Sequence, residues 1–570
     1  MASMRTTGNL SRLLVLPAVG AVLLASCAPA GPAASVQGNA PPTLKTTRTL
    51  RIDNNKETST GIGAFTTNNG NQREVAWIFH AGLTMYDTQG DLVGRLARKV
   101  PSIADGDWNL NPDGTMDVTW RLRPNVKWHD GAPLVADDFV FGLQVARDPE
   151  LPVRGGGGVR LIQNVTTPDA ETFVVRWAEP FFGANQGSLD HISAVPRRIV
   201  GDLYKEGDKQ SFANSPYWTT QFVGLGPYRM GEWAQGSFTE GLAFDDYFLG
   251  RPKIDRLIIR YINDSNVALA SLLAGDIDET SNLTTQDLVT VKGAWGAEGG
   301  SIIYSVGGFN GAMWQWRVPS APWVVDPRVR QAFMHLLDRQ TLADNFEPDG
   351  GGPQDLFAFP GDAIYRLVQQ RGYTRYAYDP ARAGALLADA GWNRGPDGLL
   401  RDRTGTPFDF EVRSNGDLPL ALAAEDMWKR GGVSVRHYSV PSNAVDRMKQ
   451  RATMQGARFP AAGPQITDDL MVQFTTAQIQ GEANNWTALN ASGHSNPERD
   501  RLYAQYAQEL DLAKRNSYNA DFVKQIADEV LQIPVYYSAT STVFRRGVRG
   551  PVPSQPNQPA AWNIEEWDVD

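Results

Sequence analysis

A single cysteine, Cys27, is present among the 570 residues of the chain. One thiol cannot form an intramolecular disulfide, so the fold must be stabilised by buried apolar side chains and not by a disulfide framework. Hydrophobic residues make up 42% of the sequence, which is enough for a sizeable core. A chain of this length ordinarily divides into about two to four domains.

The segment in front of Cys27 has the order of a secretory signal. Two arginines supply positive charge, residues 13–24 are mostly apolar, and two small residues follow directly before the cysteine. The apolar run is shorter than the roughly 20 residues that span a bilayer. We therefore expect residues 1–26 to be a signal peptide that is removed from the mature protein.

The residues Leu24-Ala25-Ser26-Cys27 resemble the lipobox of bacterial lipoproteins. The resemblance implies that Cys27 is acylated on its sulfur and on the amine freed by cleavage; the alternative is an incidental thiol. More than one acyl chain is needed for stable anchoring, since each buried methylene contributes about 0.8 kcal/mol. We expect residues 27–44, rich in Ala, Pro and Gly, to be a flexible tether. The protein is then lipid-anchored at the cell membrane and faces the periplasm or cell-wall space.

The charge balance excludes one class of partner. The formal net charge is −9 at pH 7, so the chain lacks the basic footprint of a nucleic-acid-binding protein. No basic patch that would hold it on anionic lipid is apparent either. The membrane contact that we expect is therefore the acylated cysteine alone.

The body of the chain alternates strand and helix patterns. Apolar residues alternate with polar ones over residues 116–122, which predicts a half-buried strand. Asp326-Pro327 and Asp379-Pro380 each place an N-cap residue before a proline at the first helical position. Such a mixture predicts an α/β fold.

Six segments follow one another in a characteristic order. They are RLRPNVKWHDGAPLVADDFVFGL (121–143), VGLGPYRMGEW with the following stretch (223–278), DPRVRQAFMHLLDRQTL (326–342), YDPARAGALLADAGW with the following stretch (378–412), HSNPERDRLYAQYAQELD (494–511) and IPVYY (533–537). In this order and at these spacings they resemble the extracellular solute-binding proteins of family 5, the dipeptide- and oligopeptide-binding lipoproteins of ABC importers. The resemblance extends from about residue 48 to 545.

The resemblance implies a two-lobed type II periplasmic-binding-protein fold with an extra subdomain and a ligand cleft between the lobes. It implies a monomer that binds a small molecule, either a peptide or a sugar, and docks on ABC permease and ATPase subunits. Neither a cofactor nor a metal is expected. The expected parts are lobe I at 45–86, 194–305 and 538–570 (the last including a C-terminal tail), the extra subdomain at 87–193, and lobe II at 306–537.

No catalytic constellation is apparent, so we do not expect an enzyme. The six histidines are scattered without the spacing of a zinc protease, and the one cysteine excludes cysteine-based zinc sites. His129 and Asp130 are adjacent, but we interpret them as part of a tight turn that feeds a helix capped near Asp137 or Asp138. A pair of carboxylates working as in glycosidases is the enzymatic alternative that stays open.

Aromatic residues are the main candidates for ligand contact. Trp314 and Trp316 are two residues apart and would share one strand face, where they could stack on a peptide or a sugar, or pack in the core. Trp486 lies in a polar, loop-like stretch. By the resemblance, Phe459 takes the place of an aromatic that lines the peptide pocket, and Tyr536 lies at the last crossing between lobes. The candidate ligand-binding residues are Leu225, Asn310, Trp314, Trp316, Phe459, Asp468, Trp486 and Tyr536.

One stretch departs from the family pattern. Peptide binders of the family typically place an aspartate in lobe II that pairs with the α-amino group of the ligand, whereas here Ala461, Ala462 or Gly463 takes that position. A buried ammonium without a partner is costly. Either Asp468 or Asp469 substitutes, or the ligand is neutral at that point, for instance an oligosaccharide or a blocked peptide. A lipoprotein that senses a ligand without importing it is a further alternative.

Overall fold

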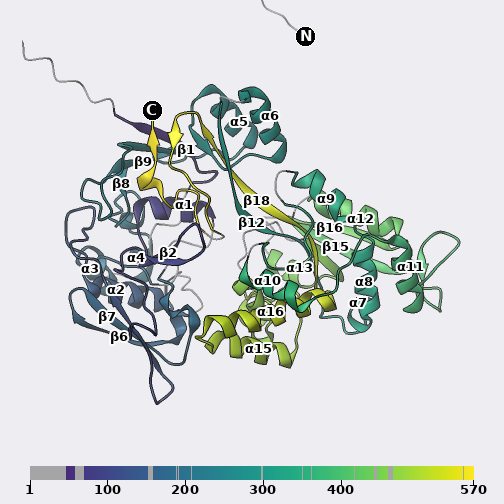
Figure 1. Cartoon of the computed structure of the whole chain (residues 1–570). Coiled ribbons are helices and arrows are strands. Elements are labelled where there is room, and N and C mark those ends of the chain that lie inside the picture. The colour runs from purple at the N-terminus through teal and green to yellow at the C-terminus, as the bar shows by residue number, and fades with distance from the viewer. Residues whose placement is uncertain are drawn as a thin grey trace, which may run out of the picture. The chain divides into compact units, whose positions relative to one another are not determined.

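A ten-stranded sheet is the largest element of the computed structural model (Figure 1). The structure describes residues 47–57, 70–151, 158–187, 189, 192–206, 208–296, 299–348, 351–360, 362–415, 418–441, 446–459, 467–555 and 558–570. In sheet order the strands are β16 (Ser434–Val440), β15 (Asp409–Asn415), β17 (Gly456–Phe459), β12 (Gly300–Trp314), β18 (Gln532–Arg545), β11 (Glu279–Thr280), β1 (Thr49–Asp53), β10 (Arg256–Arg260), β9 (Phe238–Ala243) and β8 (Tyr228–Ala234).

Smaller sheets accompany it. A four-stranded antiparallel sheet contains β4 (Trp108–Leu110), β5 (Met116–Arg121), β7 (Thr172–Trp177) and β6 (Ile162–Asp169). Two-stranded pairs are β2 (Thr84–Tyr86) with β3 (Leu92–Gly94), β13 (Asn393–Arg394) with β14 (Leu400–Arg401), and β19 (Val548–Arg549) with β20 (Asp568–Val569). The strand predicted from alternation over 116–122 is confirmed as β5, whose alternate residues are buried.

Helices cover the sheets. Those before β12 are α1 (Gly70–Phe79), α2 (Ala136–Arg147), α3 (Arg197–Glu206), α4 (Lys209–Ala213), α5 (Ser265–Ala274) and α6 (Thr285–Trp295). Those after β12 are α7 (Pro322–Val325), α8 (Pro327–His335), α9 (Arg339–Phe346), α10 (Ala363–Arg371), α11 (Pro380–Asp389), α12 (Pro419–Arg430), α13 (Arg447–Ala452), α14 (Thr467–Val472), α15 (Pro497–Gln508) and α16 (Leu512–Glu529).

The two predicted helix starts are confirmed. The Asp326 carboxylate accepts a hydrogen bond from the Arg328 N–H, and that of Asp379 accepts one from the Arg382 N–H. Each helix then begins with a proline, which loses nothing there because the first N–H of a helix has no partner within it.

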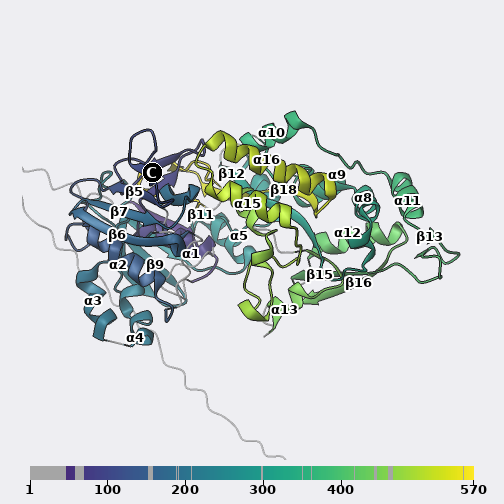
Figure 2. The same cartoon turned by 90° about the horizontal axis from the view of Figure 1, so that it is seen from below.

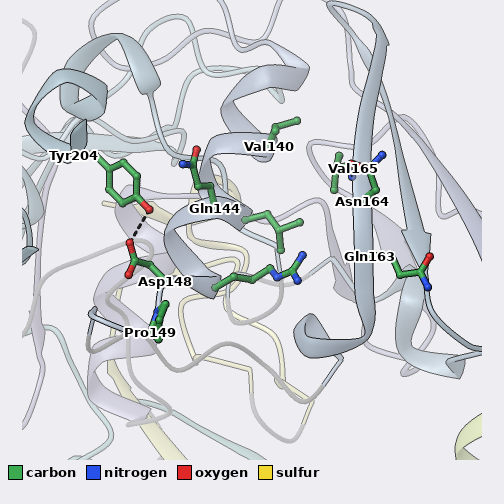
Figure 3. Close-up of a pocket in the computed structure, with 10 residues that line it drawn as sticks. Val140, Gln144, Asp148, Pro149, Gln163, Asn164, Val165 and Tyr204 are labelled. Atoms are coloured by element: carbon green, nitrogen blue, oxygen red, sulfur yellow. Dashed lines mark hydrogen bonds between the residues drawn. The ribbon is translucent and has the colours of Figure 1, made fainter. Parts of the chain in front are cut away.

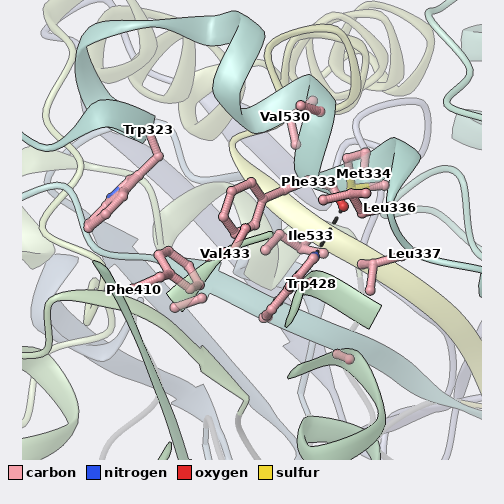
Figure 4. Close-up of a cluster of buried hydrophobic side chains, with 14 of the residues drawn as sticks. Trp323, Phe333, Met334, Leu336, Leu337, Phe410, Trp428, Val433, Val530 and Ile533 are labelled. Atoms are coloured by element: carbon pink, nitrogen blue, oxygen red, sulfur yellow. Dashed lines mark hydrogen bonds between the residues drawn. The ribbon is translucent and has the colours of Figure 1, made fainter. Parts of the chain in front are cut away.

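Two long antiparallel strands, β12 and β18, lie side by side (Figure 1), and residues near their two ends belong to separate hydrophobic cores. Near one end, Ile302 packs with Val543 in a cluster that includes α5 and α6 residues. Near the other end, Ala312 and Ile533 belong to a large cluster around α8 and α12 (Figure 4). The pairing register shifts between Val306 and Phe309 and again after Asn310, so the ladder is irregular between the two cores.

The four-stranded sheet has a core of its own. Trp120, Trp128, Phe139 and Phe173 are buried in it, and α2 supplies part of its cover. Among the described residues, no helix combines the length and the apolar character needed to cross a bilayer.

Candidate ligand-binding site

Trp314 lies inside the core and not on an open surface. Its side chain is 0% exposed, its ring stacks on Trp323 at a centroid distance of 6.4 Å, and Phe333 and Phe410 pack against it edge-on. Figure 4 shows these three neighbours directed toward one another. The structure therefore places Trp314 in the core, which is one of the two roles that we considered for it.

Trp316 does not share a strand face with Trp314, because β12 ends at Trp314. The Trp316 ring lies between the Arg330 guanidinium, 5.0 Å from its centroid, and His494, which meets it edge-on at 4.9 Å. The predicted two-tryptophan platform is therefore not formed. The physical reason is that the ladder ends two residues before Trp316, so period-two alternation does not extend to it.

Phe459 also faces the core. It is 0% exposed and packs near Trp428, with ring centroids 6.0 Å apart. Leu225 is buried with the four-stranded sheet, between two glycines that pass close to the end of α1. A Cβ at Gly224 would lie 2.0 Å from the Phe79 carbonyl oxygen, so the two backbones approach too closely there for any side chain.

Asn310 and Tyr536 are brought together. They are opposite partners in the β12–β18 ladder, at its irregular part, and both are more than nine-tenths buried. The Tyr536 ring stacks on Phe346 at 6.3 Å, and burial raises the pKa of its hydroxyl to about 12. These two residues therefore lie where the ladder passes from one core to the next.

Trp486 lies in a half-buried loop with basic neighbours. Its backbone has a φ of 58°, in the left-handed region, directly after Asn485 with a φ of 50°. The Lys449 ammonium lies 5.6 Å and the Arg317 guanidinium 6.0 Å from its ring centroid. Arg317 also donates to the carbonyls of Gln480 and Ala491, so it fixes the loop on both sides of Trp486.

Two predictions fall on parts that the structure does not describe. Cys27 belongs to residues 1–46, and Ala461, Ala462 and Gly463 belong to residues 460–466, which lie outside the described residues. The backbone of Asp468 is part of α14, but its side chain is not described. The expectation about the ligand amine therefore stays a prediction.

His129 is held by the backbone on both ring nitrogens. Its Nδ1 accepts the Gly224 N–H at 3.1 Å, and its Nε2 donates to the Gly226 carbonyl at 3.0 Å. Burial lowers the pKa of this imidazole to about 4. The neighbouring Asp130 pairs with Arg198. The turn interpretation therefore fits the structure, and the imidazole has no nitrogen free for proton transfer.

Two features were missed from the sequence. Arg458 in β17 is a buried guanidinium, 9% exposed, that faces away from the core. The alternation Ala457-Arg458-Phe459 was the signal that would have found it. Phe182, in the short helix Phe182–Asn185, packs on Tyr506 at 4.9 Å and lies under the Arg515 guanidinium at 4.7 Å. No local pattern foretells that contact, because its partners are more than 300 residues further along.

A pocket of about 440 Å³ lies elsewhere, against α2 and β6 (Figure 3). The Tyr204 hydroxyl donates to Asp148 at its edge, at 2.6 Å, and Lys209 pairs with the same carboxylate. None of the predicted ligand-binding residues lines this pocket. In the described part of the chain, no group of three or more His, Cys, Asp or Glu side chains is arranged to hold a metal ion.

Comparison with known proteins identifies the family. The model of the bacterial extracellular solute-binding proteins, family 5 (middle region), matches residues 99–482. A protein of Brucella ovis is 30% identical over 319 residues, which span 55% of this chain and only 54% of the relative, about half of its length. The oligopeptide-binding protein AppA of Bacillus subtilis is 25% identical over 80% of this chain and 81% of its own.

Solved structures establish the fold. NikZ from Campylobacter jejuni, in complex with Ni(L-His), superposes with a TM-score of 0.72 at 21% identity, covering 91% of this chain and 99% of its own. The oligopeptide-binding protein of Thermus thermophilus, in complex with a pentapeptide, gives 0.71 at 21% identity and covers 91% and 96%. The predicted type II periplasmic-binding-protein fold is confirmed. The chain belongs to the bacterial extracellular solute-binding proteins of family 5.

Proposed function

We propose that this protein is the binding component of an ABC importer, which captures a peptide-like solute outside the cytoplasm and delivers it to the permease. The observation that carries this proposal is the family match over residues 99–482. The chain aligns with the oligopeptide-binding protein AppA over 80% of its length, and this supports a peptide as the ligand.

The lobes are proposed to be 45–86, 194–305 and 538–570 for lobe I and 306–537 for lobe II, with 87–193 as the extra subdomain. The separate cores at the two ends of β12 and β18 support this division. The irregular part of the ladder, from Val306 to Gly311, begins at the proposed boundary between residues 305 and 306. Bending there is the expected hinge motion, because the regular pairing of the two strands is interrupted at the register shifts.

The contact of Phe182 with Tyr506 supports closure between these parts. Phe182 belongs to the proposed extra subdomain, and Tyr506 belongs to the proposed lobe II. A ring contact of this kind stabilises the closed form only, so a ligand that favours closure gains from it.

We infer that the protein binds its ligand without reacting with it. The family to which the chain belongs consists of solute-binding proteins, and both ring nitrogens of His129 are bonded to backbone. We therefore propose that the ligand leaves the protein unchanged, and recovery of a single unaltered compound after incubation checks this.

A non-peptide solute is the second candidate. One observation favours it: residues 461–463 carry no carboxylate at the position where the family pattern has one. NikZ, which shares the fold, is itself seen with Ni(L-His).

A deletion strain distinguishes an importer from a ligand sensor, because loss of solute uptake is expected only if the protein belongs to an importer.

Anchoring is proposed to depend on Cys27. In Cys27→Ala, no acylation site of the lipobox type remains, so the protein should stay uncleaved or be secreted. Metabolic labelling with a fatty acid and detergent partitioning measure this. A Cys27→Ala protein that still carries label would contradict the proposal.

The binding proposal itself is tested by denaturing the purified protein and identifying the released ligand by mass spectrometry. The recovered compound is then added back to ligand-free protein, and small-angle scattering should show a smaller radius of gyration. Phe182→Ala should reduce that compaction, whereas Phe181→Ala, one residue away, is the control for local disturbance. A bound compound that leaves scattering unchanged would contradict closure.

A further inference from the structure

The end of the chain folds back onto β12, the strand that runs between the two proposed lobes. Figure 1 and Figure 2 both show β12 between α1 and α8. The residues that connect β19 to β20, 550–567, are named here the C-terminal segment; they are described except for 556 and 557. Within this segment, the Ser554 N–H donates to the Ser305 hydroxyl oxygen at 3.0 Å, and the Ser554 hydroxyl donates to the same oxygen at 3.3 Å. The C-terminal segment is therefore hydrogen-bonded to β12 at Ser305.

The composition of the C-terminal segment makes it stiff. Prolines occupy positions 551, 553, 556 and 559. Each proline fixes its own φ near about −65° and restricts the residue before it. Proline-rich chains of this kind are extended and act as semi-rigid spacers. A pull on one end of the segment is therefore transmitted to the other end.

The remaining contacts of the C-terminal segment fix it to the proposed lobe I and extra subdomain. They are Gln555 Nε2 to the Thr88 carbonyl (2.9 Å), Gln558 Nε2 to the Tyr86 carbonyl (2.8 Å), the Ala560 and Ala561 N–H groups to the Glu74 carboxylate of α1 (2.9 and 2.7 Å), and Glu565 to Arg95 (2.5 Å). The pair of Glu565 and Arg95 is buried, and breaking it would leave a buried charge without its partner. The segment is therefore firmly held on this side of the molecule.

Ser305 lies next to the point where the pairing of β12 with β18 changes. The residues from Gly300 to Val306 pair regularly with β18, and the first register shift follows between Val306 and Phe309. The Ser305 side chain is buried. The C-terminal segment therefore contacts the last regularly paired part of β12, directly before the irregular part.

This contact limits where the two strands can bend. A bend that extended into residues 300–305 would separate Ser305 from Ser554, since the segment is too stiff and too firmly held to follow. Bending is then confined to the irregular part of the ladder. Because fewer backbone conformations are open to the ligand-free protein, closure around a solute costs less conformational entropy.

We propose that the C-terminal segment positions the pivot of lobe closure by holding Ser305 on lobe I, and that it thereby raises the affinity for solute without itself binding the solute. Ser305 and Ser554 are positioning residues in this scheme. The inference rests on the proposed function, because it concerns the closure of the same two lobes.

Distances between spin labels test the pivot without any solute. In the full mature chain with Cys27→Ala no other thiol is present, so labels can be attached at Val267→Cys in the proposed lobe I and Val325→Cys in the proposed lobe II, both exposed. We expect Ser305→Ala to broaden the distribution of distances between the labels. Ser305→Thr keeps the hydroxyl and should restore the original width. Ser301→Ala is the matched control, an exposed serine in the regular part of β12.

Affinity is the functional measurement. The probe is a tetrapeptide pool with free termini, titrated calorimetrically into each protein without labels. We expect Ser305→Ala to bind the pool about 2- to 10-fold more weakly, in keeping with the net contribution of one hydrogen bond, and Ser301→Ala to bind it unchanged. A purely structural role of Ser305 would lower the melting temperature and leave both the label distances and the affinity unchanged, and this result would overturn the inference.

The same broadening in Ser301→Ala as in Ser305→Ala would also overturn it. If Ser305→Ala does not fold, the double variant Ser305→Cys with Ser554→Cys in the Cys27→Ala chain takes its place. The two hydroxyl oxygens are 3.3 Å apart, so sulfurs at these positions can form a disulfide after a small shift. The oxidised protein should bind the pool at least as tightly as the reduced protein, because the contact persists during closure. Loss of binding on oxidation would overturn the inference.

The two proposals fail in different ways. If the pool binds to none of these proteins, the proposed peptide ligand is contradicted, while the label distances still decide whether Ser305 positions the pivot. If the pool binds and the label distances are the same with and without the Ser305 hydroxyl, solute binding stands and the inference is wrong.

Discussion

The turn around His129 and the strand around Arg458 differ in how their polar groups are paired. At the turn, both imidazole nitrogens bond to backbone, and the buried Asp138 carboxylate accepts from the Trp128 indole and the Val135 N–H. At the strand, the buried Arg458 guanidinium has the Met313 sulfur as its hydrogen-bond partner within the part of the chain that the structure describes. Complete pairing is what a structural element needs, whereas an open partner position is what a binding site offers.

The core-facing side of the neighbouring strand β12, which pairs with β17, sets the scale for the comparison. Trp314→Ala removes a fully buried ring from the cluster of Trp323, Phe333 and Phe410. We expect the free energy of unfolding to fall by about 3–5 kcal/mol, because a cavity replaces the ring. Denaturant unfolding measures this. A loss below about 1 kcal/mol would mean that Trp314 is not part of the rigid core.

Within the turn, Asp138→Ala should reduce stability by about 1–3 kcal/mol, because two buried donors lose their acceptor. The adjacent Asp137 is the control, since it lies in the same helical turn but is exposed and pairs with Arg197 on the surface. Asp137→Ala should change the unfolding free energy by about 0.5 kcal/mol or less. Equal effects of the two substitutions would mean that the hydrogen bonds of the buried Asp138 carboxylate contribute no more to stability than the surface ion pair of Asp137.

The burial of His129 predicts a dependence of stability on pH. Its pKa is about 4 in the folded protein against 6.5 for the ordinary side chain, so the unfolded state binds the proton first. Stability from this group is complete above about pH 6.5 and is lost as pH falls toward 4, by about 1.4 kcal/mol per pH unit.

His129→Gln should therefore flatten the curve of unfolding free energy against pH over this window by that slope. Buried carboxylates such as Glu74, whose pKa burial raises to about 7, act in the opposite sense, so the two proteins must be compared at each pH. Parallel curves for the two proteins would contradict the assignment.

A small effect on stability is expected at the half-buried loop. Trp486→Ala loses cation–π contacts with Lys449 and Arg317, worth about 1 kcal/mol together at a partly exposed site. If Trp486 also contacts ligand, affinity should fall by about 1–3 kcal/mol, more than stability. Titration of both proteins with the recovered ligand separates these effects, and unchanged affinity would leave Trp486 with a structural role.

Local patterns in the sequence determined a good deal. Alternation gave β5, the Asp-Pro pairs gave the starts of α8 and α11, and the order of six segments gave the family and its fold. These features depend on neighbours within a few residues or on a preserved order along the chain. Both the local neighbours and the order of the segments can be read from a single sequence.

Only the tertiary structure decided which side of each strand is covered. Period-two alternation says that Phe459 and Arg458 point to opposite faces, but not that helices α8 and α12 cover the Phe459 side. Trp314 became a core residue, and Arg458 a buried cation without an ion-pair partner among the described residues, because segments distant in the sequence supply the neighbours of each. Burial and charge compensation are properties of these long-range contacts, and so the sequence by itself did not determine them.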